Sequence, residues 1–300
     1  MFFRQLVPNA ITSLNLMCGC MGIVFALTEN MLWSTWMIGI AAVLDFFDGF
    51  AARLLKGQSE IGKQLDSLAD VVTFGVLPGV LSYQYITIGF HEYFIPIDER
   101  SLGHILLACC GFLIPVFSAL RLARFNVADN ETENFQGVPT PANALFFASF
   151  ALILDFQHDL NFYFSPQGND YLNLALNARW DTFDAFVINT LWSPWFHIGA
   201  AMISSFLLVS KLPMFSFKIK SLRWRPNRIR YLYLIVIGLG LIAVFFPYWD
   251  FRAIGLDWRV RNYPDIDFVI VPILLLLYPI LSILGFLLGW TKDSNATGNL

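Results

Sequence analysis

The sequence predicts an all-α fold, a polytopic membrane bundle of about eight transmembrane helices. Hydrophobic residues make up 57% of the 300 residues and charged residues only 14%, which is unlike the composition of a soluble domain. A transmembrane helix needs about 20 mostly apolar residues, and eight stretches of the chain approach that length. These stretches lack the alternating polarity of barrel strands, so helices are the expected spanning elements.

An even number of spans places both termini on the same side of the membrane. The spans are expected at residues 11–27, 32–55, 65–88, 102–120, 140–155, 195–212, 231–248 and 268–290. With a cytoplasmic N-terminus, 14 of the 19 Lys and Arg residues fall on the cytoplasmic side, as the positive-inside rule requires. We therefore expect a multi-pass protein of the cell inner (cytoplasmic) membrane.

Four aspartates interrupt the second and third spans. Asp45 and Asp48 are three residues apart and Asp66 and Asp70 are four apart, so each pair lies on one helical face. Ionised carboxylates near a bilayer are costly and repel each other, so the cluster needs a positive partner. Oxygen ligands without nearby His or Cys favour Mg²⁺ or Mn²⁺ over zinc. Two ions about 3.5 to 4 Å apart suit phosphoryl displacement, so the expected substrate is a phosphate ester.

Small residues and an arginine follow the first aspartate pair. Gly49 comes directly after Asp48, and Ala52 lies one turn further along, which leaves room for phosphates to approach the backbone. Arg53 is one turn from Gly49 and can bind phosphate oxygens in a bidentate manner. These positions favour a phosphate-binding site beside the carboxylates.

Two other interpretations of the aspartates remain open at this point. They could be ordinary surface residues at helix ends, paired with Arg53, Lys56 and Lys63, although four clustered carboxylates are more typical of a functional site. They could also line the path of a cation or proton-coupled transporter. A transport path does not explain Gly49, Ala52 and Arg53.

The segment from Leu44 to Gly75 resembles the signature of the CDP-alcohol phosphatidyltransferase family. All eight defining positions match, namely Asp45, Asp48, Gly49, Ala52, Arg53, Gly62, Asp66 and Asp70. Further segments resemble the phosphatidylserine synthase branch of that family: VPNAITSLNLMCG (7–19), SLADVVTFGVLPG (67–79), RLARFNV (121–127), GVPTPAN (137–143) and SKLPM (210–214). The resemblance therefore covers residues 7–214.

The resemblance implies a role for each aspartate and for the residues around the nucleotide. Asp45, Asp48 and Asp66 would bind metal, and Asp70 would be the general base with a share in the metal site. The CDP-lipid site would be shaped by Gly49, Ala52, Arg53 and Gly62, with help from Asn9 and Thr12 near the start of the first span. The two latter residues could equally cap the helix.

Two arginines are candidates for recognising the acceptor. Arg121 and Arg124 are three residues apart at the cytoplasmic end of the fourth span, where they could hold a carboxylate such as that of serine. They could also mark the membrane interface by extending their charged ends into water.

The resemblance implies an enzyme that transfers the phosphatidyl group of CDP-diacylglycerol to the hydroxyl of L-serine, giving phosphatidylserine and CMP. Its site would open to the cytoplasm, and its partners would be these two substrates and membrane lipids. No nucleic-acid partner is expected, and a homodimer is compatible with this interpretation. The motif would look the same for glycerol 3-phosphate or inositol phosphate as acceptor.

The same resemblance implies two regions. Residues 1–214 would form the family membrane domain, with a six-helix core and a polar, non-cytoplasmic insertion at about residues 157–193. Residues 215–300 would form a basic cytoplasmic loop and two C-terminal spans.

Overall fold

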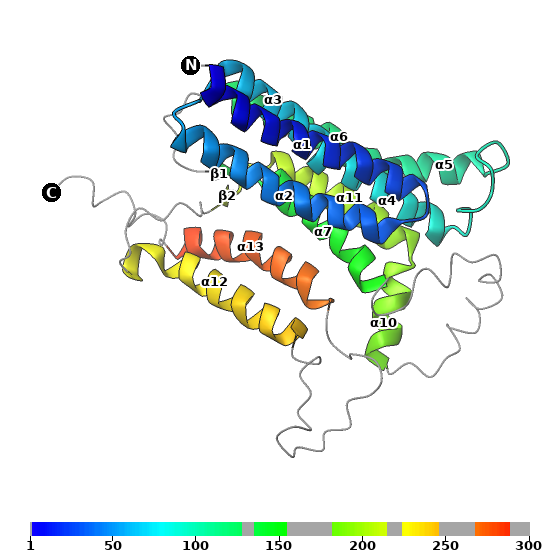
Figure 1. Ribbon diagram of the computed structural model, residues 1–300. Coiled ribbons are helices and arrows are strands. Elements are labelled where there is room, and N and C mark those ends of the chain that lie inside the picture. Colours follow the sequence, from blue (N-terminus) through cyan, green and yellow to red (C-terminus); the bar gives the residue numbers. More distant parts are fainter. Residues whose placement is uncertain (1, 128–134, 155–181, 215–223, 246–267, 289–300) are drawn as a thin grey trace, which may run out of the picture. The chain divides into compact units, whose positions relative to one another are not determined.

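The computed structural model describes residues 2–127, 135–154, 182–214, 224–245 and 268–288. Helices dominate these residues, so the predicted all-α class is confirmed (Figure 1). The chain divides into two units, residues 1–128 with 139–209 and residues 129–138 with 210–300. Each unit is described by itself.

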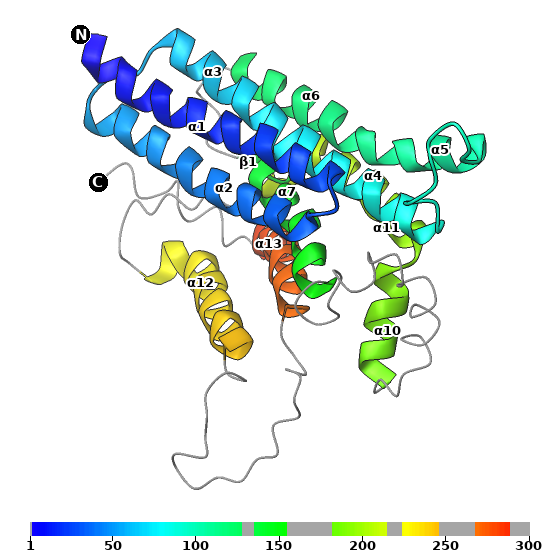
Figure 2. The same ribbon diagram turned by 45° about the vertical axis from the view of Figure 1, so that its right-hand side comes forward.

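The first unit contains most of the helices. In chain order they are α1 (Phe2–Leu27), α2 (Met31–Leu54), α3 (Glu60–Asp70), the π-helix η1 (Val71–Val76), α4 (Leu77–Gly89), α5 (Leu102–Ala108), the 3₁₀-helix η2 (Cys109–Phe112), α6 (Leu113–Val127), α7 (Thr140–Leu152), α10 (Thr182–Leu191) and α11 (Pro194–Val209). Helix α1 packs against both α2 and α3, and the three run side by side in Figures 1 and 2.

The second unit pairs two helices and two short strands. Helix α12 (Trp224–Phe245) packs against α13 (Ile270–Leu287), and Tyr233 Oη donates to Leu274 O at 3.2 Å. Strand β1 (Phe135–Gln136) pairs antiparallel with β2 (Pro213–Met214). The predicted boundary near residue 214 stays a prediction, and residues 215–223 of the basic loop lie outside the described residues.

Several helices are long and apolar enough to cross a membrane. The stretches Arg4–Leu27, Glu60–Gly89, Leu102–Val127 and Ile270–Leu287 meet this requirement, and Thr140–Leu152 and Pro194–Val209 are shorter apolar helices. A multi-pass membrane protein is thereby confirmed. The count of eight spans stays a prediction. Of the predicted insertion at 157–193, the structure describes only 182–193, which include α10.

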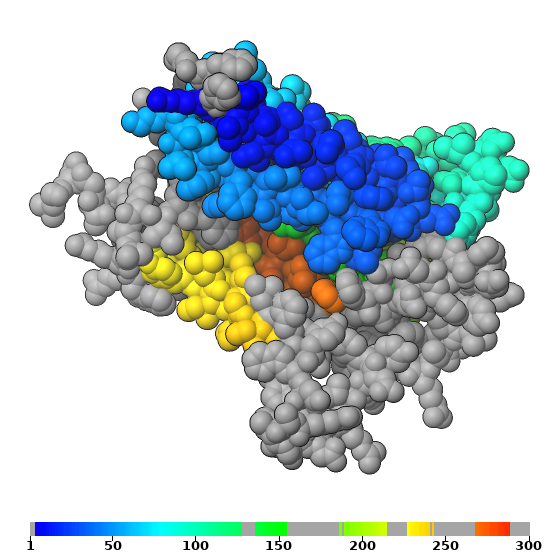
Figure 3. Space-filling view, in the orientation of Figure 1, coloured from blue at the N-terminus to red at the C-terminus, as the bar shows by residue number. Residues whose placement is uncertain are grey.

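Helices α1 and α2 expose large apolar side chains and bury polar ones, the reverse of the pattern in a soluble protein. Large apolar residues such as Val24 and Phe46 are 58% and 64% exposed, on elements whose surface appears in blue in Figure 3. Polar residues such as Asn15 and Ser34 are fully buried. This is the pattern of helices that face lipid outward and polar partners inward.

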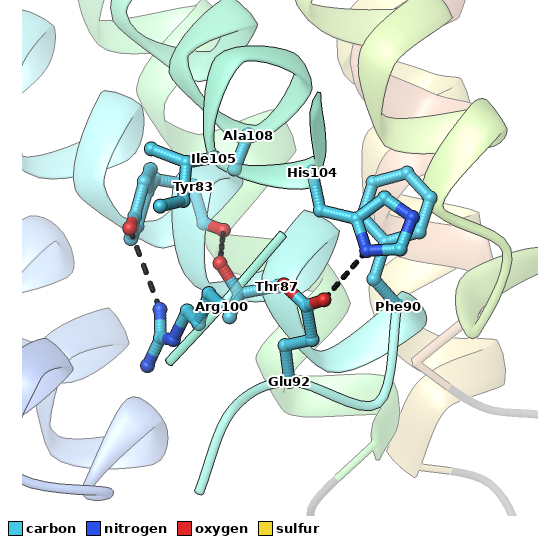
Figure 4. A pocket seen from close by; sticks show the side chains of 8 residues that line it. All are labelled: Tyr83, Thr87, Phe90, Glu92, Arg100, His104, Ile105 and Ala108. Carbon is cyan, nitrogen blue, oxygen red and sulfur yellow. Dashed lines mark hydrogen bonds and ion pairs between the residues drawn. The ribbon is translucent and has the colours of Figure 1, made fainter. Parts of the chain in front are cut away.

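Polar contacts close the connection between α4 and α5 (Figure 4). The Glu92 carboxylate lies 2.6 Å from His104 Nδ1, and the His104 ring stacks on Phe90 with centroids 4.1 Å apart. Arg100 donates to Ile95 O at 2.7 Å and to Tyr83 Oη at 3.4 Å. The hydrogen bond from His104 lowers the pKa of Glu92 below its ordinary value. This network fixes the loop that follows α4. The loop lies at the opposite end of the α3–η1–α4 segment from Asp66 and Asp70.

Candidate active site

A tight turn brings the two aspartate pairs together. Residues 55–59 reverse the chain between α2 and α3, with Lys56 in the left-handed region at φ 50°. Helix α3 begins at a capping residue, because Ser59 Oγ accepts a hydrogen bond of 3.0 Å from Gly62 N. Such a cap satisfies a backbone donor that has no partner within the helix. The turn thus connects the C-terminal end of α2 to the start of α3, and both helices pack against α1.

Three carboxylates meet across this helical hairpin. Asp45, Asp48 and Asp66 each offer an oxygen, and these atoms all lie within 4.8 Å of one another. Asp48 is only 5% exposed. The structure therefore brings together three of the four predicted metal ligands.

Helix α1 supplies a donor to this cluster. Thr12 is 3% exposed, and its hydroxyl donates to Asp48 Oδ2 at 2.6 Å. Its own backbone acceptor, Pro8 O, lies 3.0 Å away and competes for the same proton. The sequence placed Thr12 beside the nucleotide, whereas the structure shows its hydroxyl on a carboxylate of the cluster.

The basic side chains nearby do not neutralise the carboxylates. Among the described residues, no ion pair joins the cluster to Arg53, Lys56 or Lys63. Arg53 Nε instead donates to Gly49 O at 2.9 Å, and Lys63 Nζ donates to Asn126 O at 3.3 Å. The interpretation of the aspartates as paired surface residues therefore finds no support.

The donor set fits a divalent cation. Three oxygen ligands of like charge lie close together, and the buried Oδ1 of Asp66 makes no hydrogen bond with the described residues. Close carboxylates without a counter-ion repel each other, and hard oxygen ligands are those that Mg²⁺ and Mn²⁺ prefer.

Asp70 lies one turn beyond Asp66, outside the group of three. It is 8% exposed, and its Oδ1 atom makes no hydrogen bond with the described residues. The side chain of Asn15 on α1 interacts with this carboxylate. Asn15 is not among the residues predicted for the site, although its position three residues after Thr12 places both on one face of α1.

The remaining predicted CDP-lipid residues lie on α1, α2 and α3, the helices that also carry the cluster and Thr12. Asn9 faces the start of α3, since a Cβ built on Gly62 would lie 3.0 Å from Asn9 Oδ1. A Cβ built on Gly49 would meet no atom within 4 Å. The side of α2 that carries Gly49 and half-buried Ala52 therefore has free space beside the exposed Arg53.

The two candidate acceptor-binding arginines differ in their surroundings. Arg121 is 9% exposed, whereas Arg124 is exposed and donates to Val209 O at the end of α11 over 3.3 Å. A buried guanidinium requires polar or charged neighbours. The role of the two arginines in binding an acceptor stays a prediction.

The family is established by comparison of the whole sequence with known proteins. The model of the CDP-alcohol phosphatidyltransferase family matches residues 5–178. This chain therefore belongs to the CDP-alcohol phosphatidyltransferase family, a metal-dependent family of phosphotransferases.

Individual relatives agree with this family. The CDP-diacylglycerol–serine O-phosphatidyltransferase of Helicobacter pylori (strain J99) is 35% identical over 142 residues, which are 47% of this chain and 54% of that protein. The protein of the same name from Bacillus subtilis (strain 168) is 34% identical over 160 residues, 53% of this chain and 77% of that protein. The archaetidylserine synthase of Methanothermobacter thermautotrophicus is 32% identical over 149 residues, 49% and 58% respectively. The matched part of the chain thus spans about half the length of the Helicobacter relative.

Proposed function

We propose that this protein transfers the phosphatidyl group of CDP-diacylglycerol to the hydroxyl of L-serine and releases phosphatidylserine and CMP. The observation that carries the proposal is the group of three carboxylates, Asp45, Asp48 and Asp66, which lie within 4.8 Å of one another without a basic partner. The names of the bacterial relatives support serine as the acceptor.

In this proposal the aspartates have two roles, metal binding and general-base catalysis. Asp45, Asp48 and Asp66 hold Mg²⁺ or Mn²⁺, in our proposal two ions, with a share from Asp70. A metal held there would neutralise the pyrophosphate and stabilise the charge that develops on CMP. Thr12 fixes the orientation of one ligand, because its hydroxyl binds Asp48 Oδ2 at 2.6 Å.

Asp70 is the general base. It takes the proton of the serine hydroxyl while the serine oxygen attacks the phosphorus that bears the lipid, and the bond between that phosphorus and CMP breaks. Its burial at 8% exposure supports this role, because few water molecules can compete for the carboxylate. The proton remains on the Asp70 carboxylate until the products leave.

The walls of the site hold the two substrates. Asn9, Thr12, Gly49, Ala52, Arg53 and Gly62 surround the nucleotide and its phosphates. Arg53, exposed beside the open face of Gly49, is free to move from the Gly49 carbonyl to a phosphate oxygen. Arg121, with Arg124 at the rim, holds the serine carboxylate.

The orientation in the membrane completes the proposal. The protein lies in the inner membrane of the cell, and the turn at residues 55–59 faces the cytoplasm. This orientation places most Lys and Arg residues on the cytoplasmic side. Acyl chains of CDP-diacylglycerol remain in the surrounding lipid. Homodimer formation and the expected lack of a nucleic-acid partner stay predictions.

The test is a product analysis with purified protein. CDP-diacylglycerol and divalent metal are incubated in turn with L-serine, glycerol 3-phosphate and inositol phosphate, and products are identified by mass. We expect phosphatidylserine and CMP with L-serine, and no product after chelation of the metal. If product forms only with glycerol 3-phosphate or inositol phosphate, the proposed acceptor is wrong. If no CMP is released with any of the alcohols, the proposed enzymatic activity is wrong and a transporter is favoured.

A further inference from the structure

We propose that Asn15 is a positioning residue that orients the Asp70 carboxylate toward the acceptor hydroxyl. This inference rests on the proposed function, because it assigns a partner to the general base of that reaction. It arises from the packing of α1 against the chain that runs through α3, η1 and α4.

The register between α1 and this chain places Asn15 level with Asp70. Toward the N-terminus, Asn9 faces Gly62, and further along a Cβ on Gly19 would collide with Thr73 Oγ1. Helix α1 and the segment of α3 and η1 therefore run parallel to each other. The advance of ten residues from Asn9 to Gly19 corresponds to the advance of eleven from Gly62 to Thr73. Counting six residues from Asn9 reaches Asn15, and the corresponding advance from Gly62 reaches Leu68 to Ala69, within two residues of Asp70.

A hydrogen bond fixes this register close to the two side chains. Thr73 Oγ1 donates to Asn15 O at 3.2 Å, and both residues are fully buried. Thr73 follows Asp70 by three residues, so this contact with α1 lies within one turn of Asp70. Gly19 permits this approach, since any larger side chain would meet Thr73.

The Asn15 amide is buried, and its polar atoms have no hydrogen-bond partner among the described residues. Its side chain interacts with Asp70, yet Asn15 Nδ2, Asn15 Oδ1 and Asp70 Oδ1 make no hydrogen bond of good geometry with the described residues. An amide buried in this way is costly unless it gains a partner. A small movement lets Nδ2 donate to one Asp70 oxygen, which leaves the other oxygen for the substrate hydroxyl.

The π-helix η1 explains how this segment contacts both α1 and α6. Helix η1 starts directly after Asp70 and runs from Val71 to Val76. A π-turn contains one residue more than an α-turn and is frequent at functional sites. It lets Asp70 face α1 while Gly75 faces α6, where a Cβ on Gly75 would lie 3.2 Å from Ser118 Cβ.

The test separates positioning from simple packing. Asn15→Leu is compared with Gln84→Leu, because Gln84 is also a buried amide between α4 and α1, with Nε2 donating to Ala26 O at 3.0 Å. For Asn15→Leu we expect kcat to fall about 100-fold, the scale of a misplaced catalytic group. KM for both substrates should change less than about threefold, as for an interaction made only in the transition state. Gln84→Leu should lower thermal stability and leave kcat per folded molecule unchanged.

Three results would overturn the inference. An unchanged kcat in Asn15→Leu would remove Asn15 from the reaction and leave the proposed function intact. Equal losses of stability and activity in the two variants would make both amides structural. If Asn15→Leu does not fold, the smaller Asn15→Ala replaces it under the same criteria. A wild-type protein that releases no CMP with any alcohol would instead refute the proposed function and the inference with it.

Discussion

Thr12 Oγ1 donates a hydrogen bond of 2.6 Å to Asp48 Oδ2 and so joins α1 to α2 across 36 positions of the chain. Both side chains are at most 5% exposed. A hydrogen bond to a carboxylate in such surroundings is strong and directional. It holds the Asp48 carboxylate in one orientation.

Replacing Thr12 by valine should weaken the metal site. Thr12→Val keeps the shape of the side chain and removes the donor, and loss of a partner that orients a ligand commonly costs about 10- to 100-fold in metal affinity or activity. We expect the Mg²⁺ or Mn²⁺ concentration for half-maximal CMP release to rise by about tenfold or more. Ser13→Ala is the matched control, since exposed Ser13 donates to Asn9 O within its own helix. Equal metal requirements in the two variants would contradict the role of Thr12.

Asp70→Asn should abolish turnover without harming the fold. A general base commonly contributes about 100- to 10,000-fold to rate, and removing one of four clustered carboxylates relieves repulsion. CMP release should therefore fall at least about 100-fold, while CDP-lipid binding persists and the melting temperature does not decrease. Near-normal CMP release by this variant would show that another group accepts the proton.

The turn between α2 and α3 should be accessible only from the cytoplasm. Gln58→Cys, in a background with the four native cysteines replaced by serine, should resist a membrane-impermeant thiol reagent in intact cells and react after lysis. Asp98→Cys, in the connection between α4 and α5, serves as the matched position on the opposite side and should react in intact cells. The reverse pattern would invert the proposed topology.

The contact between Glu92 and His104 should make the connection between α4 and α5 sensitive to acid. The pKa of Glu92 is lowered in the folded protein by the hydrogen bond from His104. Its stabilising effect is present above the ordinary pKa of Glu, about 4.3, and is lost as the pH falls through the lowered value. The protection of the amides of residues 90–101, measured as the exchange rate relative to the intrinsic rate at each pH, should therefore fall at strongly acidic pH, and Glu92→Gln should remove that dependence. Identical pH profiles in both proteins would disprove the contribution of Glu92.

Hydropathy predicts the helices well where the apolar run and the helix coincide. The span expected at 32–55 is α2, Met31–Leu54, and the span expected at 195–212 is α11, Pro194–Val209. The first helix begins at Phe2 rather than near residue 11, because its first turns carry polar residues and hydropathy detects only the apolar part. The π-turn at Val71–Val76 and the 3₁₀-turn at Cys109–Phe112 interrupt helices whose apolar pattern continues through them.

The site is predictable only as far as local spacing determines it. Helical periodicity brings Asp45 and Asp48 to one face, and the signature predicts that Asp66 joins them, as the structure shows. The pairing of Thr12 with Asp48 and of Asn15 with Asp70 depends on the register between α1 and its neighbours. The close approach of Gly19 to Thr73 is part of the register between α1 and η1, and no motif within a single helix encodes such a contact between helices.

The most direct test of the proposed reaction follows the serine oxygen. Purified protein is incubated with CDP-diacylglycerol, Mg²⁺ or Mn²⁺ and L-serine labelled with ¹⁸O in its hydroxyl, and both products are analysed by mass. Attack of that oxygen on the lipid-bearing phosphorus predicts that phosphatidylserine carries the label and that CMP does not. Unlabelled phosphatidylserine, or release of CMP with phosphatidic acid instead, would contradict direct transfer to serine.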